Sequence, residues 1–369
     1  MKIKIQKAKL LDALKKVQSA ANAKTPLPIL ANVKINAAEG QIGFTTTNLD
    51  LTLYAEAECE VSEPGVTTVP MKMLFNVVCA MIDGEVEMEL RNDKMRIKGG
   101  NYITNIGTMS VDTFPKNDID KQSVELKFIM AKKQMRDLIR RSSYAMSQDD
   151  TRRLLKGVLF AVSEKGLNCV ATDGRRLALV ENDGDLGCKD EKSFIIPSLS
   201  IGSIQKFLEG DGDVVVEVTS TQARFCTDGG ADEIITKLVD GVFPNYKAVV
   251  PSNTDKVAQV DRADLIGAVE RVSVMATRSD MSIKMTFDDN RLLVEVKGDD
   301  FCDAHDEIPV KYSAEKVEII FNPRYVLDVM RASDADEVEF AMNSGHSAAI
   351  IRNADEHMMC VLMPLRVNA

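Results

Sequence analysis

The segment Cys169–Val180 reads CVATDGRRLALV, in which two apolar, β-prone runs enclose a short polar turn. Asp173-Gly174 stands at the centre of this turn, and glycine adopts the positive φ of tight hairpin turns at little cost. The segment therefore predicts a β-hairpin with its turn at Gly174. A plain surface turn explains the same residues equally well, so the rest of the chain has to decide.

Two other segments have a similar character. Residues 243–251 read FPNYKAVVP and residues 361–367 read VLMPLRV; both are apolar, contain proline and carry a basic residue. The second segment would also suit a terminal strand that closes the last sheet. The shared character of the three segments favours a common role over three unrelated turns.

A strand-plus-helix unit recurs along the chain. Short β-prone runs occupy residues 2–5, 66–69, 124–129, 193–196, 256–260 and 317–321. A helical pattern follows each run, at residues 7–17, 71–82, 132–143, 199–208, 262–272 and 324–330. In the first pattern Leu10, Leu14 and Val17 share one face, as in an amphipathic helix. The units recur about every 60–70 residues, which indicates an internal repeat.

Pairs of these units make a longer period of about 125–130 residues. Polar, turn-rich joints at residues 115–123 and 251–256 separate the pairs. The sequence therefore predicts an α+β fold of three similar domains, each with two helices packed on antiparallel sheet. We place these domains at residues 1–120, 121–252 and 253–369. Arrays of like domains extend as a solenoid or close into a ring, and periodicity alone leaves both open.

Four motifs carry a family resemblance. TPLPIL at residues 25–30, TDGRRLA at 172–178, FPNY at 243–246 and MPLR at 363–366 occur in this order. In these motifs the chain resembles the DNA polymerase III β subunit family, the bacterial DNA sliding clamps. The resemblance implies the DNA clamp fold, in which two three-domain chains close head to tail into a homodimeric ring. It also implies a non-enzymatic processivity factor that encircles double-stranded DNA and tethers the replicative polymerase.

The resemblance further implies a pocket between the second and third domains. It would receive a short peptide of the replicative polymerase, the clamp loader and other partners. Its residues here would be Leu155, Thr172, Gly174, Arg175, Arg176, Leu177, Pro244, Val249, Val361, Met363, Pro364, Leu365 and Arg366. Leu, Val, Met and Pro suit an apolar cleft, and polar groups at its rim would fix the direction of the peptide. The chain departs from the family pattern at Arg175, where histidine is common, and at Ala248, where a basic residue is common.

The charge of the chain is unevenly distributed. Its net charge of −10 argues by itself against a nucleic-acid partner. Residues 7–17 nevertheless carry four lysines against one aspartate, and residues 132–143 carry five basic residues against one aspartate. Counted over residues 7–17, 71–82, 132–143, 198–209, 262–278 and 323–331, the six helical segments with their flanks together carry +10, so the remainder carries −20. A basic wall on an acidic body would attract duplex DNA through its phosphates, without reading its sequence.

Solvated faces of ordinary amphipathic helices are the alternative explanation of these charges. If the charges instead form a basic wall for DNA, the DNA-facing residues are Lys7, Lys9, Lys15, Lys16, Lys132, Lys133, Arg136, Arg140 and Arg141. Lys24 joins them through the resemblance, as the counterpart of a basic loop residue that touches DNA in the family. There is no recognition-helix motif and no Trp, so we expect no readout of bases.

The resemblance also implies an interface in which the first domain of one chain contacts the third domain of the other. The acidic segment 299–307 (DDFCDAHDE) lies in the third domain. Basic residues of the first domain opposite this segment would fix the register of the interface between the two chains. We predict the dimer-interface residues Lys72, Arg96, Ile103, Ile106, Val274, Met275, Asp299, Asp300 and Asp303. A solvated acidic loop explains the same segment equally well.

No catalytic constellation is evident. The three histidines at 305, 346 and 357 lack metal-ligand spacing, and no phosphate-binding or nucleophile-elbow motif occurs. We therefore predict no enzymatic activity, no metal and no cofactor. Two rivals remain open. A DNA-modifying enzyme of repeated α+β domains would need a divalent metal and a carboxylate cluster, and a monomeric adaptor would keep only the peptide pocket.

The cysteines and the apolar segments bear on location. Seven cysteines are scattered without a CxxC pair, which fits unpaired thiols in a reducing compartment. No apolar run approaches the roughly 18–20 residues that cross a bilayer, and residues 1–14 lack the apolar core of a signal peptide. We expect a cytoplasmic protein that does not contact a membrane.

Overall fold

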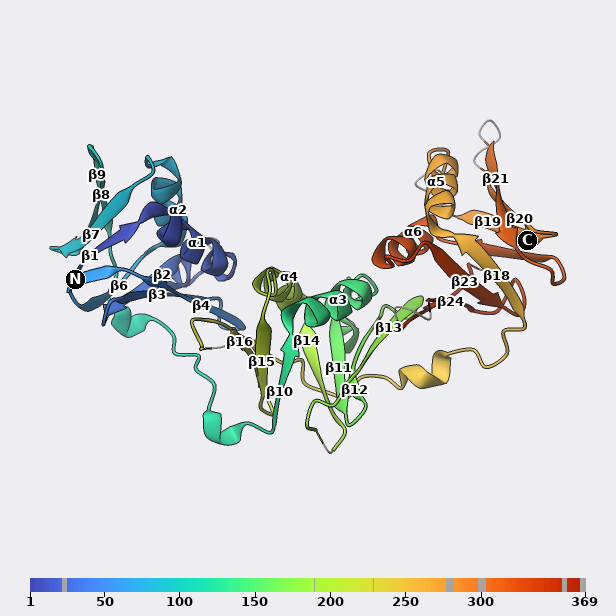
Figure 1. Cartoon of the computed structure of the whole chain (residues 1–369), viewed down its shortest axis with the longest axis horizontal. Helices are drawn as coiled ribbons and strands as arrows, with labels where there is room; N and C mark the ends of the chain where they lie inside the picture. Colours follow the sequence, from blue (N-terminus) through green and yellow to red (C-terminus); the bar gives the residue numbers. More distant parts are fainter. Residues whose placement is uncertain are drawn as a thin grey trace. The chain divides into compact units, whose positions relative to one another are not determined.

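The computed structural model describes residues 1–21, 25–188, 190–227, 229–276, 282–297, 303–353 and 357–365. Each of its six described helices directly follows a strand, and these pairs recur along the chain in the coloured sequence of Figure 1. This recurrence confirms the α+β repeat that the sequence predicts. No helix in the described ranges is long and apolar enough to cross a membrane.

The helices begin and end close to their predicted bounds. They are α1 (Lys7–Val17), α2 (Met71–Ala80), α3 (Lys132–Ser143), α4 (Ser198–Phe207), α5 (Arg262–Ser273) and α6 (Pro323–Ala332). Pro323 occupies the first turn of α6, where a missing N–H costs no hydrogen bond, and the Asn322 side chain caps that turn. Helix α1 buries Leu10, Leu14 and Val17, the predicted face, and packs beside α2 and over β4 (Leu51–Glu58).

The strands of the described residues form three sheets. The first has the order β5 (Glu60–Glu63), β1 (Lys2–Gln6), β7 (Glu85–Arg91), β8 (Lys94–Gly99) and β9 (Tyr102–Gly107). The second runs β10 (Leu126–Ala131), β15 (Asp213–Val218), β16 (Gln222–Thr227), β17 (Asp232–Lys237), β4, β3 (Gln41–Thr47), β2 (Asn32–Ala38) and β6 (Gly65–Pro70).

The third sheet is the longest. Its order is β14 (Lys192–Pro197), β11 (Gly157–Ser163), β12 (Gly166–Thr172), β13 (Arg176–Asp183), β25 (Met358–Leu362), β24 (Ala349–Asn353), β23 (Glu337–Met342), β18 (Lys256–Asp261), β21 (Asp303–Lys311), β20 (Arg291–Lys297), β19 (Ile283–Asp288) and β22 (Val317–Phe321). Its strands pair antiparallel, and so do those of the other two sheets.

Strand β10 differs from its prediction. The sequence pattern starts the strand at residue 124, but the strand begins at Leu126. A short 3₁₀ turn over Lys121–Ser123 precedes it, and the Asp120 side chain accepts a hydrogen bond from the Gln122 N–H at its start. The Glu125 N–H already donates to the Val218 carbonyl of β15 at 2.8 Å, so the chain joins the sheet directly before the strand begins.

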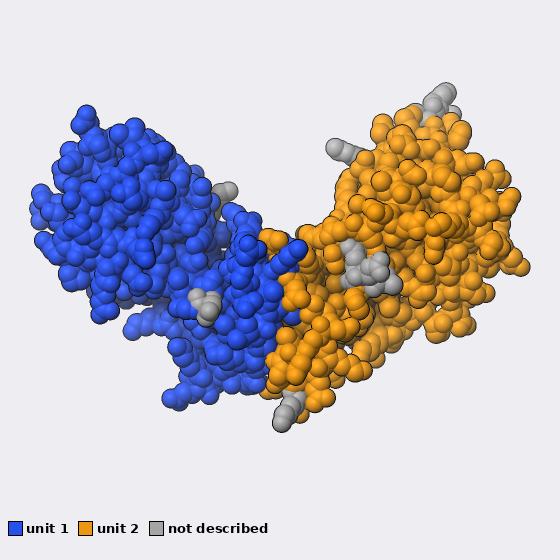
Figure 2. Space-filling view, viewed as in Figure 1, with its two compact units in different colours: residues 1–133, 202–238 blue, residues 134–201, 239–369 orange. Residues whose placement is uncertain are grey.

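The chain forms two compact units, shown in different colours in Figure 2. Unit 1 comprises residues 1–133 and 202–238, and unit 2 comprises residues 134–201 and 239–369. The division cuts through the predicted second domain because its strands extend two different sheets. Strand β17 pairs with β4 inside unit 1, and β13 pairs with β25 inside unit 2. Main-chain hydrogen bonds thus join neighbouring repeats, and the predicted domain boundaries stay a prediction.

Candidate functional site

The predicted hairpin is formed by β12 and β13, and its turn is fixed by two short side chains. Thr172 pairs with Leu177, and the Thr172 hydroxyl donates to the Arg176 carbonyl at 2.6 Å. The Asp173 carboxylate accepts hydrogen bonds from the N–H groups of Arg175 and Arg176, at 2.8 and 3.0 Å. Gly174 has φ +82°, which an L-residue with a side chain rarely adopts. The sequence predicted this hairpin correctly.

Two distant segments complete the walls around the hairpin. Strand β25 lies beside β13, and the pairing ends where the Met363 N–H donates to the Arg175 carbonyl at 2.9 Å. On the other side, Phe243 is buried in an apolar cluster with Leu177 and Val361, and a 3₁₀ turn over Tyr246–Val249 follows it. The three segments with a similar character in the sequence therefore meet in space, within unit 2.

Together these segments enclose a cavity of about 410 Å³. Of the predicted pocket residues, it is lined by Leu155, Thr172, Gly174, Arg175, Arg176, Leu177, Pro244, Val249, Val361 and Met363. Pro364 and Leu365 are described but are not among the lining residues, and Arg366 lies outside the described residues. Sequence reasoning missed Asn245, Tyr246 and Ala348. Asn245 and Tyr246 belong to the quoted FPNY motif, whereas nothing in the sequence marks Ala348.

The lining is mostly apolar. Leu177 and Val361 are buried at the base of the cavity, whereas Val249 and Met363 expose about half of their surface, 55% and 49%. Exposed apolar side chains of this size cost free energy in water unless a partner covers them. Burial raises the pKa of the Tyr246 hydroxyl, with the nearby charges of Glu181 and Glu191 adding to the effect, so it stays a neutral hydrogen-bonding group. The cavity is suited to apolar side chains, with polar groups at its edge.

Arg176 is held by groups of its own chain. Its guanidinium donates to Asp173, to Asp328 on α6 and to the Tyr144 carbonyl, at 3.2, 2.5 and 2.6 Å. The rings of Tyr144 and Tyr325 lie 5.3 and 4.4 Å from the guanidinium carbon, within cation–π range. Only 10% of the side chain is exposed. Arg176 therefore shapes the wall of the cavity, and three of its five N–H groups donate within the chain.

The predicted DNA-facing residues fall into two groups. Lys7, Lys9 and Lys16 form ion pairs in unit 1, with Asp83, with Glu58, and with both Asp12 and Asp232. Arg140 and Arg141 pair with Asp334 in unit 2. In contrast, Lys15, Lys133 and Arg136 have no ion-pair partner among the described residues, and the Lys132 ammonium lies 5.7 Å from the Phe207 ring centroid. Lys24 lies outside the described residues.

Three of these lysines border one cavity. Lys15, Lys16 and Lys132 line a hollow of about 550 Å³ in unit 1, together with Lys206. Asp12, Glu209 and Asp232 also line it, and two of these three carboxylates are paired with Lys16. Lys15 and Lys206 have no ion-pair partner among the described residues, and the Lys132 ammonium lies over the Phe207 ring.

The predicted interface residues lie in both units. In unit 1, Ile103 on β9 and Lys72 on α2 are exposed, Arg96 is half-buried near Glu89, and Ile106 is buried in the core. In unit 2, Val274 and Met275 are exposed after α5, and Asp303 is exposed on β21. Asp299 and Asp300 lie outside the described residues. Ile106 supports its edge strand from the inside and does not present a surface to a partner.

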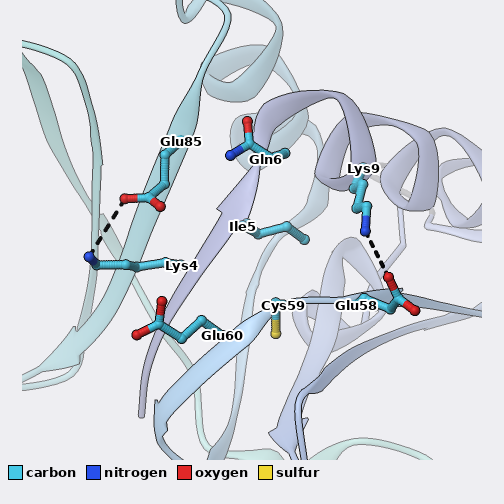
Figure 3. A pocket seen from close by; sticks show the side chains of 8 residues that line it. All are labelled: Lys4, Ile5, Gln6, Lys9, Glu58, Cys59, Glu60 and Glu85. Carbon is cyan, nitrogen blue, oxygen red and sulfur yellow. Dashed lines mark hydrogen bonds and ion pairs between the residues drawn. The ribbon is translucent and has the colours of Figure 1, made fainter.

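A smaller cavity of about 270 Å³ lies among β1, β4, β5 and β7 (Figure 3). Its lysines already have partners, since Lys4 lies 3.7 Å from Glu85 and Lys9 lies 2.8 Å from Glu58. Within the described ranges no group of three His, Cys, Asp or Glu side chains could hold a metal ion. Neither observation points to a reaction centre.

Unit 1 repeats the backbone of the pocket with different side chains. Here β17 lies beside β4, and the Lys237 N–H donates to the Asp50 carbonyl at 2.8 Å, as Met363 does to Arg175. Thr52 stands where the other sheet has Leu177. The Asn117 amide donates to the Thr52 hydroxyl at 2.8 Å and accepts from Gln222 at 2.7 Å. We name these three residues the Asn117 bridge.

Comparison with known proteins covers the whole chain. Three family models match in order: the N-terminal domain of the DNA polymerase III beta subunit at residues 1–118, its central domain at 129–245 and its C-terminal domain at 247–366. The beta sliding clamp of Pseudomonas aeruginosa is 31% identical over 372 residues, and that of Caulobacter vibrioides is 31% identical over 376 residues. Both matches cover 100% of each chain.

Solved structures agree with these relatives. A crystal structure of the Pseudomonas aeruginosa DNA polymerase III subunit beta has a TM-score of 0.95, at 30% identity and with full coverage of both chains. A Bartonella birtlesii sliding clamp bound to griselimycin has a TM-score of 0.93, at 31% identity and with the same coverage. By sequence and by fold, the chain belongs to the DNA polymerase III beta subunit family, the bacterial sliding clamps.

Proposed function

We propose that this sliding clamp docks the peptides of its partners in the 410 Å³ cavity of unit 2. As a member of its family it is an accessory processivity subunit of DNA polymerase III and not an enzyme. The observation that carries the docking site is the convergence of three sequence segments on one apolar cavity, with Val249 and Met363 half exposed. A peptide with bulky apolar residues would cover both side chains and remove their surface from water.

The DNA-holding residues that we propose are the basic ones without an ion-pair partner among the described residues. Lys15, Lys132, Lys133 and Arg136 are free to contact phosphates, whereas Lys7, Lys9, Lys16, Arg140 and Arg141 already neutralise carboxylates of this chain. A few weak phosphate contacts suit a clamp, because the protein has to hold duplex DNA and still move along it. Pairing within the chain thus leaves only part of the predicted basic wall for DNA.

The ring follows from the family, and its seam is our proposal. Two chains would close head to tail through Lys72, Arg96 and Ile103 of the first domain and Val274, Met275 and Asp303 of the third. The exposed apolar side chains would form the centre of this seam, and the opposite charges would fix its register. We propose the cytoplasm as the location, because this is where bacterial chromosomes are replicated, and domains at residues 1–120, 121–252 and 253–369.

The docking site is tested with the double variant Leu177→Ala/Met363→Ala. Both side chains line the cavity, and neither residue belongs to the proposed seam. We expect the affinity for a short fluorescent peptide that carries Gln and two bulky apolar residues to fall at least about tenfold, since each lost apolar contact contributes about 1 kcal/mol or more. Fluorescence anisotropy measures this affinity.

The matched control is Val257→Ala, another exposed apolar residue of unit 2 that does not line the cavity. It should bind the peptide like the unaltered protein. Sedimentation should give the same oligomer for all three proteins. Unchanged affinity in the double variant would remove the cavity from consideration as the docking site.

A further inference from the structure

We propose that unit 1 contains a closed copy of the docking pocket, and that four side chains prevent this copy from taking a peptide. They are Thr52, Asn117, Gln222 and Lys237. The inference rests on the proposed docking site of unit 2 and concerns a different place in the chain. It comes from two turns, one in each unit, that have the same hydrogen bonds.

The turn between β3 and β4 in unit 1 repeats the turn between β12 and β13 in unit 2. The Thr47 hydroxyl donates to the carbonyl four residues later, and the Thr172 hydroxyl does the same. Both hydroxyls accept from the N–H two residues later. The side-chain oxygen of Asn48 accepts from the N–H groups two and three residues later, as that of Asp173 does. Both turns continue with a residue of positive φ, 78° in unit 1 and 82° in unit 2. They are copies of one backbone structure.

The strands beside the two turns match as well. The N–H of Lys237 on β17 donates to the turn of unit 1, at the position from which Met363 donates in unit 2. Lys237 pairs with Gln222 on β16. In unit 2 the residue before Met363 pairs with Ala349 on β24. This register sets Gln222 at the position of Ala348, which lines the pocket of unit 2.

A linker with the same motif reaches each turn. It reads FPKN at residues 114–117 in unit 1 and FPNY at residues 243–246 in unit 2. The first phenylalanine is buried with residues of the 3₁₀ turn Pro28–Ala31, and the cluster of the second packs against the 3₁₀ turn Arg153–Leu155. The tyrosine that ends the motif in unit 2 lines the pocket. Asn117 therefore stands at the position of a lining residue.

In unit 1 hydrogen bonds fill the space that is open in unit 2. The Asn117 bridge continues into the turn, because the Thr52 hydroxyl donates to the Thr47 hydroxyl at 2.8 Å. Hydrogen bonds thus run without a break from Gln222 through Asn117 and Thr52 to the turn. Unit 2 cannot form this chain of hydrogen bonds, because a leucine replaces Thr52 and an alanine replaces Gln222.

A charge pair covers the rim of the copy. The Lys237 ammonium lies 3.0 Å from the Asp50 carboxylate, on the residue to which its own N–H donates. In unit 2 the same two positions carry Met363, which is half exposed, and Arg175, which has no ion-pair partner among the described residues. Such an exposed pair adds little stability. It does place charges where the pocket of unit 2 presents an apolar side chain.

The two units therefore share a backbone and differ in whether an apolar side chain can enter. Specificity between similar sites often depends on groups that oppose the wrong complex, and polar side chains at an apolar docking position have this effect. On this view the four side chains determine which joint of the chain takes partners. Replacing them with their counterparts from unit 2 should open a second site.

The test transfers these four counterparts into unit 1. The variant is Thr52→Leu/Asn117→Tyr/Gln222→Ala/Lys237→Met, made in the full-length Leu177→Ala/Met363→Ala protein so that the pocket of unit 2 contributes little. The probe is a short fluorescein-labelled peptide that carries Gln and two bulky apolar residues. Fluorescence anisotropy measures its affinity.

We expect the transfer to raise the affinity at least about fivefold above that of the Leu177→Ala/Met363→Ala protein. The matched control, in the same protein, is Asn36→Ala/Lys94→Met. It removes an exposed amide and an exposed lysine of unit 1 and adds a methionine, and neither residue belongs to the Asn117 bridge or to the turn. This control should not raise the affinity.

Circular dichroism during thermal denaturation shows whether each variant folds. If the fourfold variant does not fold, the milder Thr52→Leu/Gln222→Ala variant decides, with an expected gain of about twofold.

Three results would overturn the inference, and they are distinguishable. A folded transfer variant that binds no better than the Leu177→Ala/Met363→Ala protein shows that unit 1 holds no copy of the site, and it leaves the docking site of unit 2 intact. An equal gain in the control attributes the gain to an exposed methionine and not to the turn. If the Leu177→Ala/Met363→Ala protein binds as tightly as the unaltered chain, the docking site of unit 2 itself fails, and the copy fails with it.

Discussion

Arg176 shows how one side chain joins parts of the chain that are far apart in the sequence. Its partners come from the turn at Asp173, from Tyr144 after α3, and from Tyr325 and Asp328 on α6. The Tyr144 hydroxyl lies 2.8 Å from the Cys360 sulfur on β25. Burial raises the pKa of Tyr144 well above its usual value, with Cys360 contributing, so the hydroxyl stays neutral. The wall of the pocket is therefore held by a nearly closed polar cluster.

Removal of this guanidinium should destabilise unit 2. We predict that Arg176→Ala lowers the free energy of unfolding by about 2–3 kcal/mol, because Asp173 and Asp328 lose a buried countercharge. Urea denaturation followed by circular dichroism measures the change. Arg175→Ala, one residue away and exposed, should change it by less than about 0.5 kcal/mol. Equal effects of the two substitutions would contradict the distinction between them.

At this scale the sequence predicts some contacts and not others. Asp173-Gly174 predicts its hairpin because the interaction is local: a short acidic side chain and a glycine determine the turn. The ring contacts of Arg176 depend on residues 144 and 325, and no periodicity connects these positions. The sequence places Arg175 and Arg176 alike on the wall of the pocket. Only the folded chain shows that Arg176 pairs with Asp173 and Asp328, whereas Arg175 has no ion-pair partner among the described residues.

At the scale of elements, the end of α3 is tied to the end of α6. Arg140 donates to the Ala332 carbonyl at 3.0 Å, and Arg140 and Arg141 both pair with Asp334, Arg141 at 3.1 Å. Partial burial alone would raise the pKa of Asp334, but the hydrogen bond from Arg141 and the charges of both arginines outweigh it and lower the pKa. The positive charges of Arg140 and Arg141 in the last turn of α3 also interact favourably with the macrodipole of this helix.

The stabilisation by the ion pairs of Asp334 with Arg140 and Arg141 should depend on pH in a defined direction. A carboxylate whose pKa is lowered by folding stabilises the protein above its unfolded pKa, near 3.8, and loses this effect as pH falls through the folded value. We predict that Asp334→Asn lowers the free energy of unfolding at pH 7 by at most about 1 kcal/mol, since the pair is open to water. The difference in Tm between Asp334→Asn and the unaltered protein should shrink as the pH falls below about 3.8, because Asp334 then becomes protonated.

Thermal denaturation at several pH values measures this difference. Asp336→Asn is the control, because it changes the same charge two residues away without an arginine partner among the described residues. Its Tm should follow that of the unaltered protein at every pH. A constant gap between Asp334→Asn and the unaltered protein down to low pH would argue that the aspartate acts through packing and not through its charge.

The elements themselves were largely predictable. Helix α1 and helix α3 have their predicted bounds, since apolar spacing fixes them. The pairing of β13 with β25 was not predicted, because partners such as Ala178 and Cys360 lie far apart in the sequence. Alternation of side chains says which face of a strand is buried, not which strand lies alongside.

At the scale of the whole molecule, the family membership leads to a prediction about DNA. After loading onto nicked circular duplex DNA, the protein should stay bound when the salt concentration rises, and it should leave when a restriction enzyme linearises the circle. Phosphate contacts fade steeply with salt, whereas a closed ring does not depend on them. Gel filtration of radiolabelled protein with DNA measures what is retained. Equal loss from circular and linear DNA would contradict closure around the duplex.

Basic residues without an ion-pair partner among the described residues provide a second test of how the clamp holds DNA. Lys133→Gln/Arg136→Gln should weaken low-salt association with duplex DNA and reduce the slope of log affinity against log salt by about 1–2. The matched variant Lys7→Gln/Lys9→Gln removes two charges that already form ion pairs with Asp83 and Glu58. It should leave the slope nearly unchanged. Equal slopes in the two double variants would remove the distinction between paired and free lysines.

The Asn117 bridge has a consequence for stoichiometry. Unit 1 repeats the strand pairing that supports the pocket in unit 2, yet Thr52 replaces a leucine and Asn117 and Gln222 fill its side with hydrogen bonds. An apolar peptide that entered there would have to leave these polar groups unpaired, which costs more than its burial gains. If partners dock in the cavity of unit 2 as proposed, the described part of each chain holds one such cavity, and a ring of two chains would carry at most two partner peptides at once. Partners beyond that number would have to wait for one of the two to dissociate.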